Sequence, residues 1–172
     1  KRLFDANVTD AAGVIDRLCE WFDVPAAPEQ RQALVELLGK NVKQVIDEGV
    51  GFVPEDRTVD GLVGDFTVAE NLILNRSAGA PFFRAATLDL GVLRQFADDK
   101  ITEFDIRTQS AESKADELSG GNQQKVVLAR ELSRPLKLFV ASQPTRGIDV
   151  GSIEFVHKRI VETRDSGVPV IV

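Results

Sequence analysis

The chain has 172 residues, 43% of them hydrophobic and 28% charged, which is the composition of an ordinary soluble globular domain. Its 21 basic and 27 acidic residues give a net charge of −6, which argues against non-specific nucleic-acid binding, because that requires a basic surface. A single cysteine, Cys19, excludes an internal disulfide and a cysteine metal cluster, and it fits a reduced compartment. Since the sequence lacks methionine and ends in an apolar run, we expect a processed chain or a truncated fragment.

The first 48 residues predict two helices. Thr9 and Asp10 can cap a helix over residues 11–22, with one apolar face made of Val14, Ile15, Leu18 and Phe22. A second helix is predicted from about residue 29 towards residue 48, interrupted or ended in its first half by Gly39. Its apolar stripe comprises Leu34, Leu37, Leu38, Val42, Val45 and Ile46.

The middle of the chain alternates loops and helices after one short strand. Residues 50–53 predict a buried strand closed by Pro54, and the polar, glycine-rich residues 55–65 predict a loop. Thr67 can cap a helix that reaches residue 74, with Glu70 at the capping-box position. After a loop over residues 75–83, a helix is predicted over residues 88–104, with five inward side chains: Leu90, Leu93, Phe96, Ile101 and Phe104. Residues 108–115 predict another loop.

The last third of the chain predicts a strand, a helix and a second strand. A helix over residues 122–133 precedes the strand at residues 136–141. The next helix, over residues 150–164, has one apolar face made of Ile153, Val156, Ile160 and Val161, and residues 168–172 form the second strand. This order and spacing predict a parallel βαβ unit.

The three residues Ser119, Gly120 and Gly121 stand at the start of a predicted helix. The first backbone N–H groups of a helix lack internal partners, and the helix dipole makes that end positive. Two glycines allow a phosphate to come close, and the serine adds a hydroxyl donor. The pattern indicates an anion site, although an ordinary helix cap explains a lone Ser-Gly-Gly more simply.

The longer string LSGGNQQKVVLAREL, residues 118–132, resembles the signature motif of ABC-transporter ATPases, and its GNQQK part is typical of importers for simple sugars and nucleosides. In the same order, LKLFVASQPT matches the Walker B strand of that family and RGIDVGS matches the D-loop. Upstream, GVGFVPEDRTVDGLVGDFTVAENLIL is similar to the Q-loop region of the second ATPase half of such importers. The resemblance covers about residues 49–172.

In this family two ATPase halves hold ATP between them, head to tail. The resemblance implies that the signature residues Ser119, Gly120 and Gly121 contact the γ-phosphate of ATP bound by the Walker A loop of a partner half. It implies three further nucleotide-site residues, which are Gln123, the D-loop residue Asp149, and Glu55 at a position where the first half usually has glutamine.

A Walker A motif, G-x-x-x-x-G-K-[ST], is missing from the sequence. The nearest string, LVELLGKN at residues 34–41, has Asn41 in place of Ser or Thr and Leu34 in place of the first Gly. Because it lies within an amphipathic helical pattern, we interpret it as structural. Residues 1–48 do not resemble the family at the place where Walker A is expected.

The Walker B strand lacks the two acids that an active member of the family carries at its end. Ser142 stands at the position of the aspartate that holds Mg²⁺, and Gln143 at that of the glutamate that activates water. Serine supplies no negative charge and glutamine accepts no proton, so neither is a confident catalytic residue and no metal site is predicted. A purely structural strand is the simpler alternative.

Other conspicuous residues have plainer interpretations. His157 is a surface or packing residue, and Trp21 belongs to the core. The charges of residues 55–57 form either a solvated loop or, by resemblance, a link between the nucleotide site and the membrane subunit. The pair Phe82–Phe83 either forms an exposed contact patch or folds back onto the helix over residues 88–104, and we favour the second.

Together these features predict an α/β fold, a partial ABC-type ATPase domain of the P-loop NTPase kind with a prominent α-helical subdomain. Residues 1–48 form a helical segment of unclear origin and residues 49–172 the ATPase fragment. Within the fragment, residues 67–133 form the helical signature subdomain, and residues 134–172 carry the Walker B and D-loop part of the core.

The predicted function is that of the ATP-binding component of an ABC importer for simple sugars or nucleosides, acting as a degenerate half at the cytoplasmic face of the cell membrane. Its expected partners are a second ATPase half, which holds ATP and Mg²⁺, the membrane permease, and indirectly a solute-binding protein; no nucleic acid is expected. Two alternatives stay open at this point. One is an ABC-type binding module without a transport role, and the other is a structural remnant whose first 48 residues bind another protein.

Overall fold

The computed structural model describes residues 40–76, 81–84 and 87–172. The predicted helix over residues 11–22, the first part of the second predicted helix, Cys19 and Trp21 lie outside the described residues. None of the described helices is long and apolar enough to cross a lipid bilayer.

The centre of the structure is a parallel sheet in the order β1-β4-β5. Its strands are β1 (Val50–Val53), β4 (Leu138–Ala141) and β5 (Val170–Ile171). Helix α7 (Val150–Asp165) connects β4 to β5, which confirms the predicted parallel βαβ unit. β1 has the predicted bounds, and its residues pair in register with β4, from Val50 opposite Leu138 to Val53 opposite Ala141.

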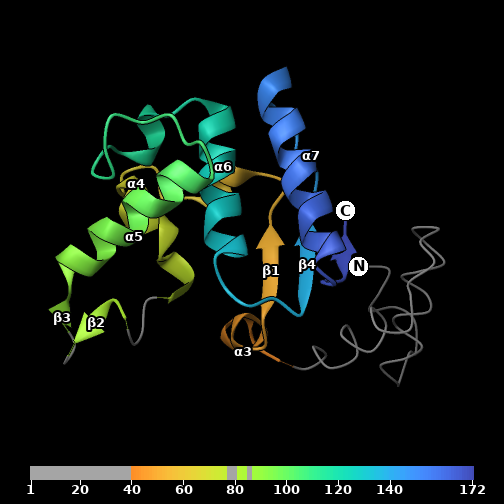
Figure 1. Cartoon of the computed structure of the whole chain (residues 1–172), viewed down its shortest axis with the longest axis horizontal. Helices are drawn as coiled ribbons and strands as arrows, with labels where there is room; N and C mark the ends of the chain where they lie inside the picture. Colours follow the sequence, from red (N-terminus) through yellow and green to blue (C-terminus); the bar gives the residue numbers. More distant parts are fainter. Residues whose placement is uncertain (1–39, 77–80, 85–86) are drawn as a thin grey trace.

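A helical layer stands beside this sheet (Figure 1). It consists of α4 (Val68–Leu72), α5 (Leu90–Glu103) and α6 (Gly120–Leu132), and α6 lies between the sheet and the other two helices. α4 begins as predicted, because Thr67 and Glu70 form a reciprocal capping box. The short helix α3 (Val42–Asp47) precedes β1.

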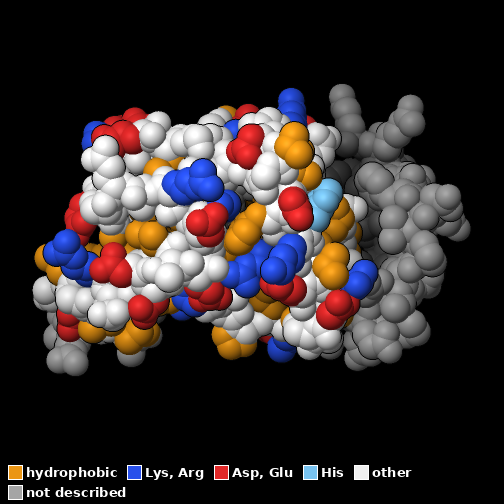
Figure 2. Space-filling model, turned by 45° about the horizontal axis from the view of Figure 1, so that its top comes forward, with side chains coloured by type: hydrophobic (Ala, Val, Ile, Leu, Met, Phe, Trp, Pro, Cys, Tyr) orange, Lys and Arg blue, Asp and Glu red, His pale blue; other side chains and the backbone are white. Residues whose placement is uncertain are grey.

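Helix α6 is the core of the molecule. Four consecutive residues, Val126, Val127, Leu128 and Ala129, are all fully buried, so the middle of α6 is buried on every side rather than along a single stripe. Phe139 of β4 is also fully buried against the same cluster. On the other face of the sheet Phe52 of β1 remains half exposed. The outer surface carries acidic and basic side chains side by side (Figure 2).

Two predicted loops contain short regular elements. Residues 55–65 hold a π-helical turn, η1 (Arg57–Gly61), because the Asp56 carboxylate accepts the N–H groups of Thr58 and Val59 and so caps the turn. The prediction that this segment is only a loop was wrong. The loop predicted at residues 108–115 ends in a 3₁₀ turn, η3 (Ala115–Glu117).

The predicted loop over residues 75–83 carries parts of two elements. It begins within a 3₁₀ turn, η2 (Leu74–Arg76), and ends in strand β2 (Phe83–Arg84), which pairs antiparallel with β3 (Thr87–Leu88). Phe82 is buried, and its ring packs edge-to-face on that of Phe96, with centroids 5.0 Å apart. For Phe82, the prediction that this phenylalanine pair folds back onto the following helix is therefore confirmed.

Three residues assigned to apolar helix faces are exposed. Val42 is 77% exposed because Asn41 caps α3 as a separate short helix, so the continuous stripe predicted through this region is broken. Leu90 is 70% exposed because it is the first residue of α5, next to its Asp89 cap. Val161 is 42% exposed because α7 buries the row that contains Ser152, Val156 and Ile160, and Val161 lies about a quarter turn away.

Candidate functional site

The predicted signature loop, Leu118–Lys125, leads into α6, and the helix begins two residues earlier than predicted. Ser119 is the N-cap residue, with an extended backbone, and Gly120 and Gly121 belong to the first turn. The Ser119 side chain caps none of the first N–H groups of the helix. Its Oγ instead accepts a hydrogen bond of 2.9 Å from the side-chain amide of Asn122.

The two signature glycines are in close contact with other parts of the chain. A Cβ on Gly121 would lie 2.6 Å from Asp149 Oδ2 and closer still to Ser152 Oγ, at the start of α7. A Cβ on Gly120 would lie 2.5 Å from Arg57 Nη2 and 3.1 Å from the carbonyl oxygen of Gly147. The glycines therefore allow the signature loop to pack against the D-loop segment, a structural role that the sequence interpretation did not include.

Asp149 is the N-cap of α7. Its carboxylate accepts the backbone N–H of Ser152 at 3.0 Å and the Ser152 hydroxyl at 2.7 Å. The hydroxyl hydrogen bond, followed by the backbone one, lowers the pKa of Asp149 below its usual value. Asp149 is therefore ionised at neutral pH, and it lies beside Gly121 of the same chain.

The charged residues after β1 are bound to the D-loop segment and do not form a freely solvated loop. The Arg57 guanidinium donates to the carbonyl oxygens of Arg146 at 2.9 Å and Gly147 at 3.2 Å. Glu55, which is half exposed, forms an ion pair with the Arg146 side chain. Three segments, namely residues 55–57, 119–121 and 146–149, therefore meet at one edge of the structure.

Ser142 and Gln143, the predicted Walker B positions, follow directly after the carboxyl end of β4. The Ser142 N–H continues the sheet by donating to the Val53 carbonyl at 2.9 Å. Gln143 is exposed and has a left-handed backbone, with φ of 45°. Neither residue offers a carboxylate to Mg²⁺, and the part of the chain that the structure describes holds no cluster of three or more His, Cys, Asp or Glu side chains.

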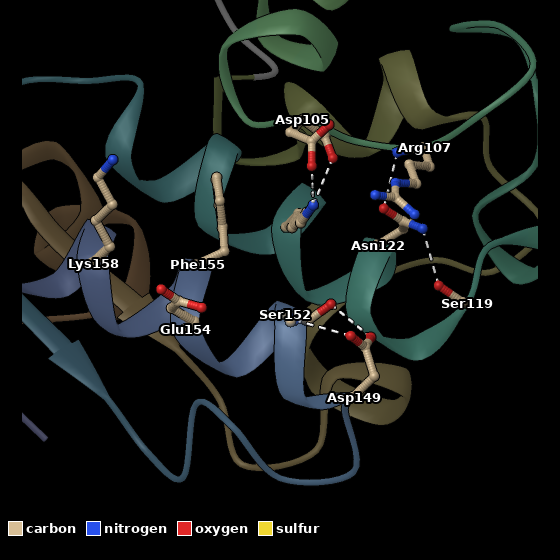
Figure 3. Close-up of a pocket in the computed structure, with 11 residues that line it drawn as sticks. Asp105, Arg107, Ser119, Asn122, Asp149, Ser152, Glu154, Phe155 and Lys158 are labelled. Carbon is tan, nitrogen blue, oxygen red and sulfur yellow. Dashed lines mark hydrogen bonds and ion pairs between the residues drawn. The ribbon is translucent and has the colours of Figure 1, made fainter.

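A cavity of about 420 Å³ opens between α6 and α7 (Figure 3). Two predicted site residues, Ser119 and Asp149, line it, whereas Glu55, Gln123, Ser142 and Gln143 do not. The Gln123 side chain donates to the Ala115 carbonyl at 3.0 Å and so holds the segment before the signature loop. Residues around the cavity that had not been predicted as site residues include Asp105, Arg107, Asn122, Lys125, Phe155 and Lys158.

Lys125 closes one wall of this cavity. Although almost fully buried, its ammonium donates to the Asp105 carbonyl at 2.6 Å and to the Asp105 carboxylate at 2.8 Å, and it lies 4.8 Å from the centre of the Phe155 ring. The hydrogen bond from Lys125 lowers the pKa of Asp105. Asn122 and Lys125 fall within the signature string, but nothing local in the sequence marks Asp105 or Arg107 as their neighbours.

The two described residues of the string closest to Walker A have structural roles, as predicted. The Lys40 ammonium forms an ion pair with Glu48 at 2.7 Å. Asn41 forms a capping box with Gln44 at the start of α3. Residues 34–39 of this string lie outside the described residues.

Known proteins with similar sequences come from import systems. The chain is 42% identical over 142 residues to the guanosine import ATP-binding protein NupO of Bacillus subtilis, a match that covers 80% of this chain and 28% of that protein. It is 42% identical to the nucleoside import ATP-binding protein NupA of Lactococcus lactis, over 80% of this chain and 27% of that protein. It is 36% identical to the ribose import ATP-binding protein RbsA of Bacillus licheniformis, over 77% of this chain and 26% of that protein. No family model matches the sequence.

Solved structures of similar fold are ABC cassettes. The dimeric ABC transporter cassette MJ0796 matches with a TM-score of 0.56 at 22% identity, covering 87% of this chain and 57% of the cassette. The same cassette bound to ADP and phosphate matches with a TM-score of 0.54.

The fold is therefore that of part of an ABC-type ATPase domain, α/β with a helical subdomain, as the sequence predicted. Within that class, the chain is homologous to the ATP-binding proteins of sugar and nucleoside import systems. It spans about a quarter of the length of these curated relatives. The longest matches exceed the 124 residues between Gly49 and Val172, so the similarity also includes residues upstream of Gly49.

Proposed function

We propose that this chain is part of the ATP-binding component of an ABC importer for simple sugars or nucleosides. In this role it supplies its signature loop, Leu118–Lys125, to ATP that is bound by a partner ATPase half. The names of the curated relatives support the transport class, and the dimeric state of the MJ0796 cassette supports pairing of two halves.

The observation that carries this proposal is the position of the Ser119 hydroxyl. It is exposed, it lines the cavity, and it caps none of the N–H groups of its own helix. It stands at the positive end of α6, where hydroxyl and backbone donors favour an anionic group such as the γ-phosphate of ATP. Gly120 and Gly121, the first two residues of α6, place no side chain next to this hydroxyl.

According to this proposal, this half does not hydrolyse ATP by itself. Ser142 and Gln143 replace the two acids of Walker B, so Mg²⁺ and the attacking water belong to the site of the partner half. We place residues 67–133 in the signature subdomain and residues 134–172 in the core. The complex sits peripherally at the cytoplasmic face of the membrane, on permease subunits that receive solute from a binding protein.

The test is ATP hydrolysis by the partner half of the same import system, measured with and without this chain. Wild-type chain should stimulate hydrolysis, and Ser119→Arg should abolish the stimulation because the bulky cation occupies the place of the γ-phosphate. Ser166→Arg is the matched control. Ser166 is exposed at the C-terminal end of α7, whereas Asp149 and the cavity lie at the N-terminal end, so this variant should stimulate like the wild type. Equal stimulation by both arginine variants would contradict the proposal.

A second measurement tests the inactivity of this half. The isolated chain should show no Mg²⁺-dependent ATP turnover above the buffer blank, at concentrations where the partner half is active. Robust turnover that depends on Mg²⁺ would contradict the assignment of Ser142 and Gln143 as neutral replacements of the catalytic acids.

A further inference from the structure

Asn122 connects the signature serine to the loop that precedes η3. Its Oδ1 accepts the backbone N–H of Arg107 at 2.9 Å, and its Nδ2 donates to Ser119 Oγ at 2.9 Å. Both contacts lie at the edge of the cavity between α6 and α7 (Figure 3). A single half-buried amide thus bridges two residues that are 12 positions apart in the sequence.

The direction of both hydrogen bonds follows from elementary chemistry. A backbone N–H can only donate, so the atom of Asn122 that faces Arg107 must be the carbonyl oxygen. The amide NH₂ then necessarily faces Ser119, and the serine oxygen must accept. The Ser119 hydroxyl has one proton, which is not used in this contact and has no acceptor among the described residues.

The loop that orients Asn122 is itself held firmly. Lys125, one helical turn further along α6, binds both the carbonyl and the carboxylate of Asp105, and Asp105 has a left-handed backbone with φ of 48°. These contacts fix the chain direction two residues before the N–H of Arg107. The group that sets the orientation of the Asn122 amide is therefore a backbone N–H close to this anchored residue, and a backbone N–H cannot become an acceptor.

We propose that Asn122 is a positioning residue that keeps the Ser119 hydroxyl a hydrogen-bond donor towards the nucleotide bound by the partner half. This inference rests on the proposed function and adds to it the residue that sets the direction of the serine proton. Without Asn122, the hydroxyl is free to rotate and donate elsewhere. With an acceptor in its place, the hydroxyl proton is drawn towards residue 122 and away from the phosphate.

Asn122→Asp is the decisive variant because it keeps the shape of the side chain. One carboxylate oxygen still accepts the Arg107 N–H, but the other now accepts the Ser119 proton. We expect the stimulation of the partner ATPase to fall about 10- to 100-fold, the value of one hydrogen bond to a charged group. Asn122→Ala removes the alignment but leaves the proton available, so its loss should be smaller. A merely structural role predicts the reverse order.

The added negative charge of Asn122→Asp is controlled with Ser119→Ala. If Asn122→Asp acts through the serine, adding it to Ser119→Ala should cause no further loss of ATPase stimulation. If it acts by repelling the phosphate directly, the further loss should remain in the Ser119→Ala background. A further loss in that background, or a larger loss in Asn122→Ala than in Asn122→Asp, would overturn the inference and leave the proposed function intact. No stimulation by the wild-type chain would overturn both.

Discussion

Gly121 at the start of α6 lies directly against Ser152 at the start of α7, with no room between them for a methyl group. Asp149 lies beside the same contact and caps α7 through its hydrogen bonds with Ser152. The predicted signature loop and the predicted D-loop segment, residues 146–152, are therefore in direct contact. This contact is possible because Gly121 has no side chain.

Gly121→Ala should therefore destabilise the fold. The added Cβ would lie 2.6 Å from Asp149 Oδ2, 2.9 Å from Ser152 Cβ and closer still to Ser152 Oγ, so the start of α7 must shift, at a cost of about 1–3 kcal/mol. Gly151→Ala is the matched control, because its nearest contact, with Asp149 Oδ1, would be an ordinary 3.4 Å, and it should not lower the free energy of unfolding, since alanine is the better helix former. Urea unfolding measures both, and similar values for the two variants would contradict this packing.

Glu131 is the centre of a buried polar network at the end of α6. Its carboxylate pairs with Arg130 at 2.8 Å and Arg134 at 3.2 Å, and it accepts the N–H of Phe52 at 3.3 Å. Arg130 also donates to the Gly61 carbonyl at 2.7 Å, so the network joins α6 to β1 and to η1.

Glu131→Ala should lower the free energy of unfolding by about 3–5 kcal/mol, because it leaves two buried guanidinium groups without their counter-charge. Glu154→Ala, at an exposed position of α7, provides the comparison and should have little effect. Urea unfolding of both variants is the measurement. If Glu131→Ala cost less than about 1 kcal/mol, the network would not hold β1 to α6 as argued.

Phe82, which directly precedes β2, packs against Phe96 of α5. Its side chain is 1% exposed and packs on Phe96, so Phe82→Ala removes a whole ring from the core and should cost about 3–5 kcal/mol. Phe66→Ala, at a side chain that is 43% exposed, should cost clearly less. Thermal unfolding by circular dichroism separates the two. An equal loss for both would indicate that burial of Phe82 does not stabilise this region.

The depressed pKa of Asp149 predicts a specific loss of stability in acid. A carboxylate whose pKa is lower in the folded state stabilises that state fully above its unfolded pKa of about 3.9, and this stabilisation disappears as the pH falls through the folded value. Ser152→Ala removes the hydroxyl donor and should raise the pKa of Asp149 towards its usual value. The wild-type melting temperature should therefore fall more steeply below about pH 4 than that of Ser152→Ala.

Carboxyl NMR titration measures this pKa directly in both proteins. An Asp149 pKa that is the same in the wild type and in Ser152→Ala would show that the hydroxyl does not lower it. Parallel melting curves in acid would lead to the same conclusion.

Local patterns predicted the elements whose causes lie within a few residues. Thr67 and Glu70 form the capping box that their spacing indicates, and β1 has its predicted bounds. The βαβ unit followed from the alternation of apolar runs and helical periodicity in the last third of the chain. The signature string identified the start of α6, although the helix includes both glycines.

Side-chain environments were harder to predict where an element is short or its neighbour is distant in sequence. The exposure of Val42 and Leu90 depends on where a cap residue starts the helix, and a helical period does not contain that information. The turn η1 was missed because a polar segment gives no hydrophobic signal, and a single Asp56 carboxylate organises it.

The sequence by itself determined the class of this protein, since ordered motifs and helix and strand periodicity are carried by residues close together in the chain. Only the tertiary structure decided how its site is assembled. Arg57 binds carbonyls about 90 positions away, Gly121 packs on Ser152, and the Arg107 N–H orients Asn122. Such contacts depend on how helices and strands pack against one another. Packing brings together residues that are far apart in the sequence, and no regular spacing in the sequence identifies them.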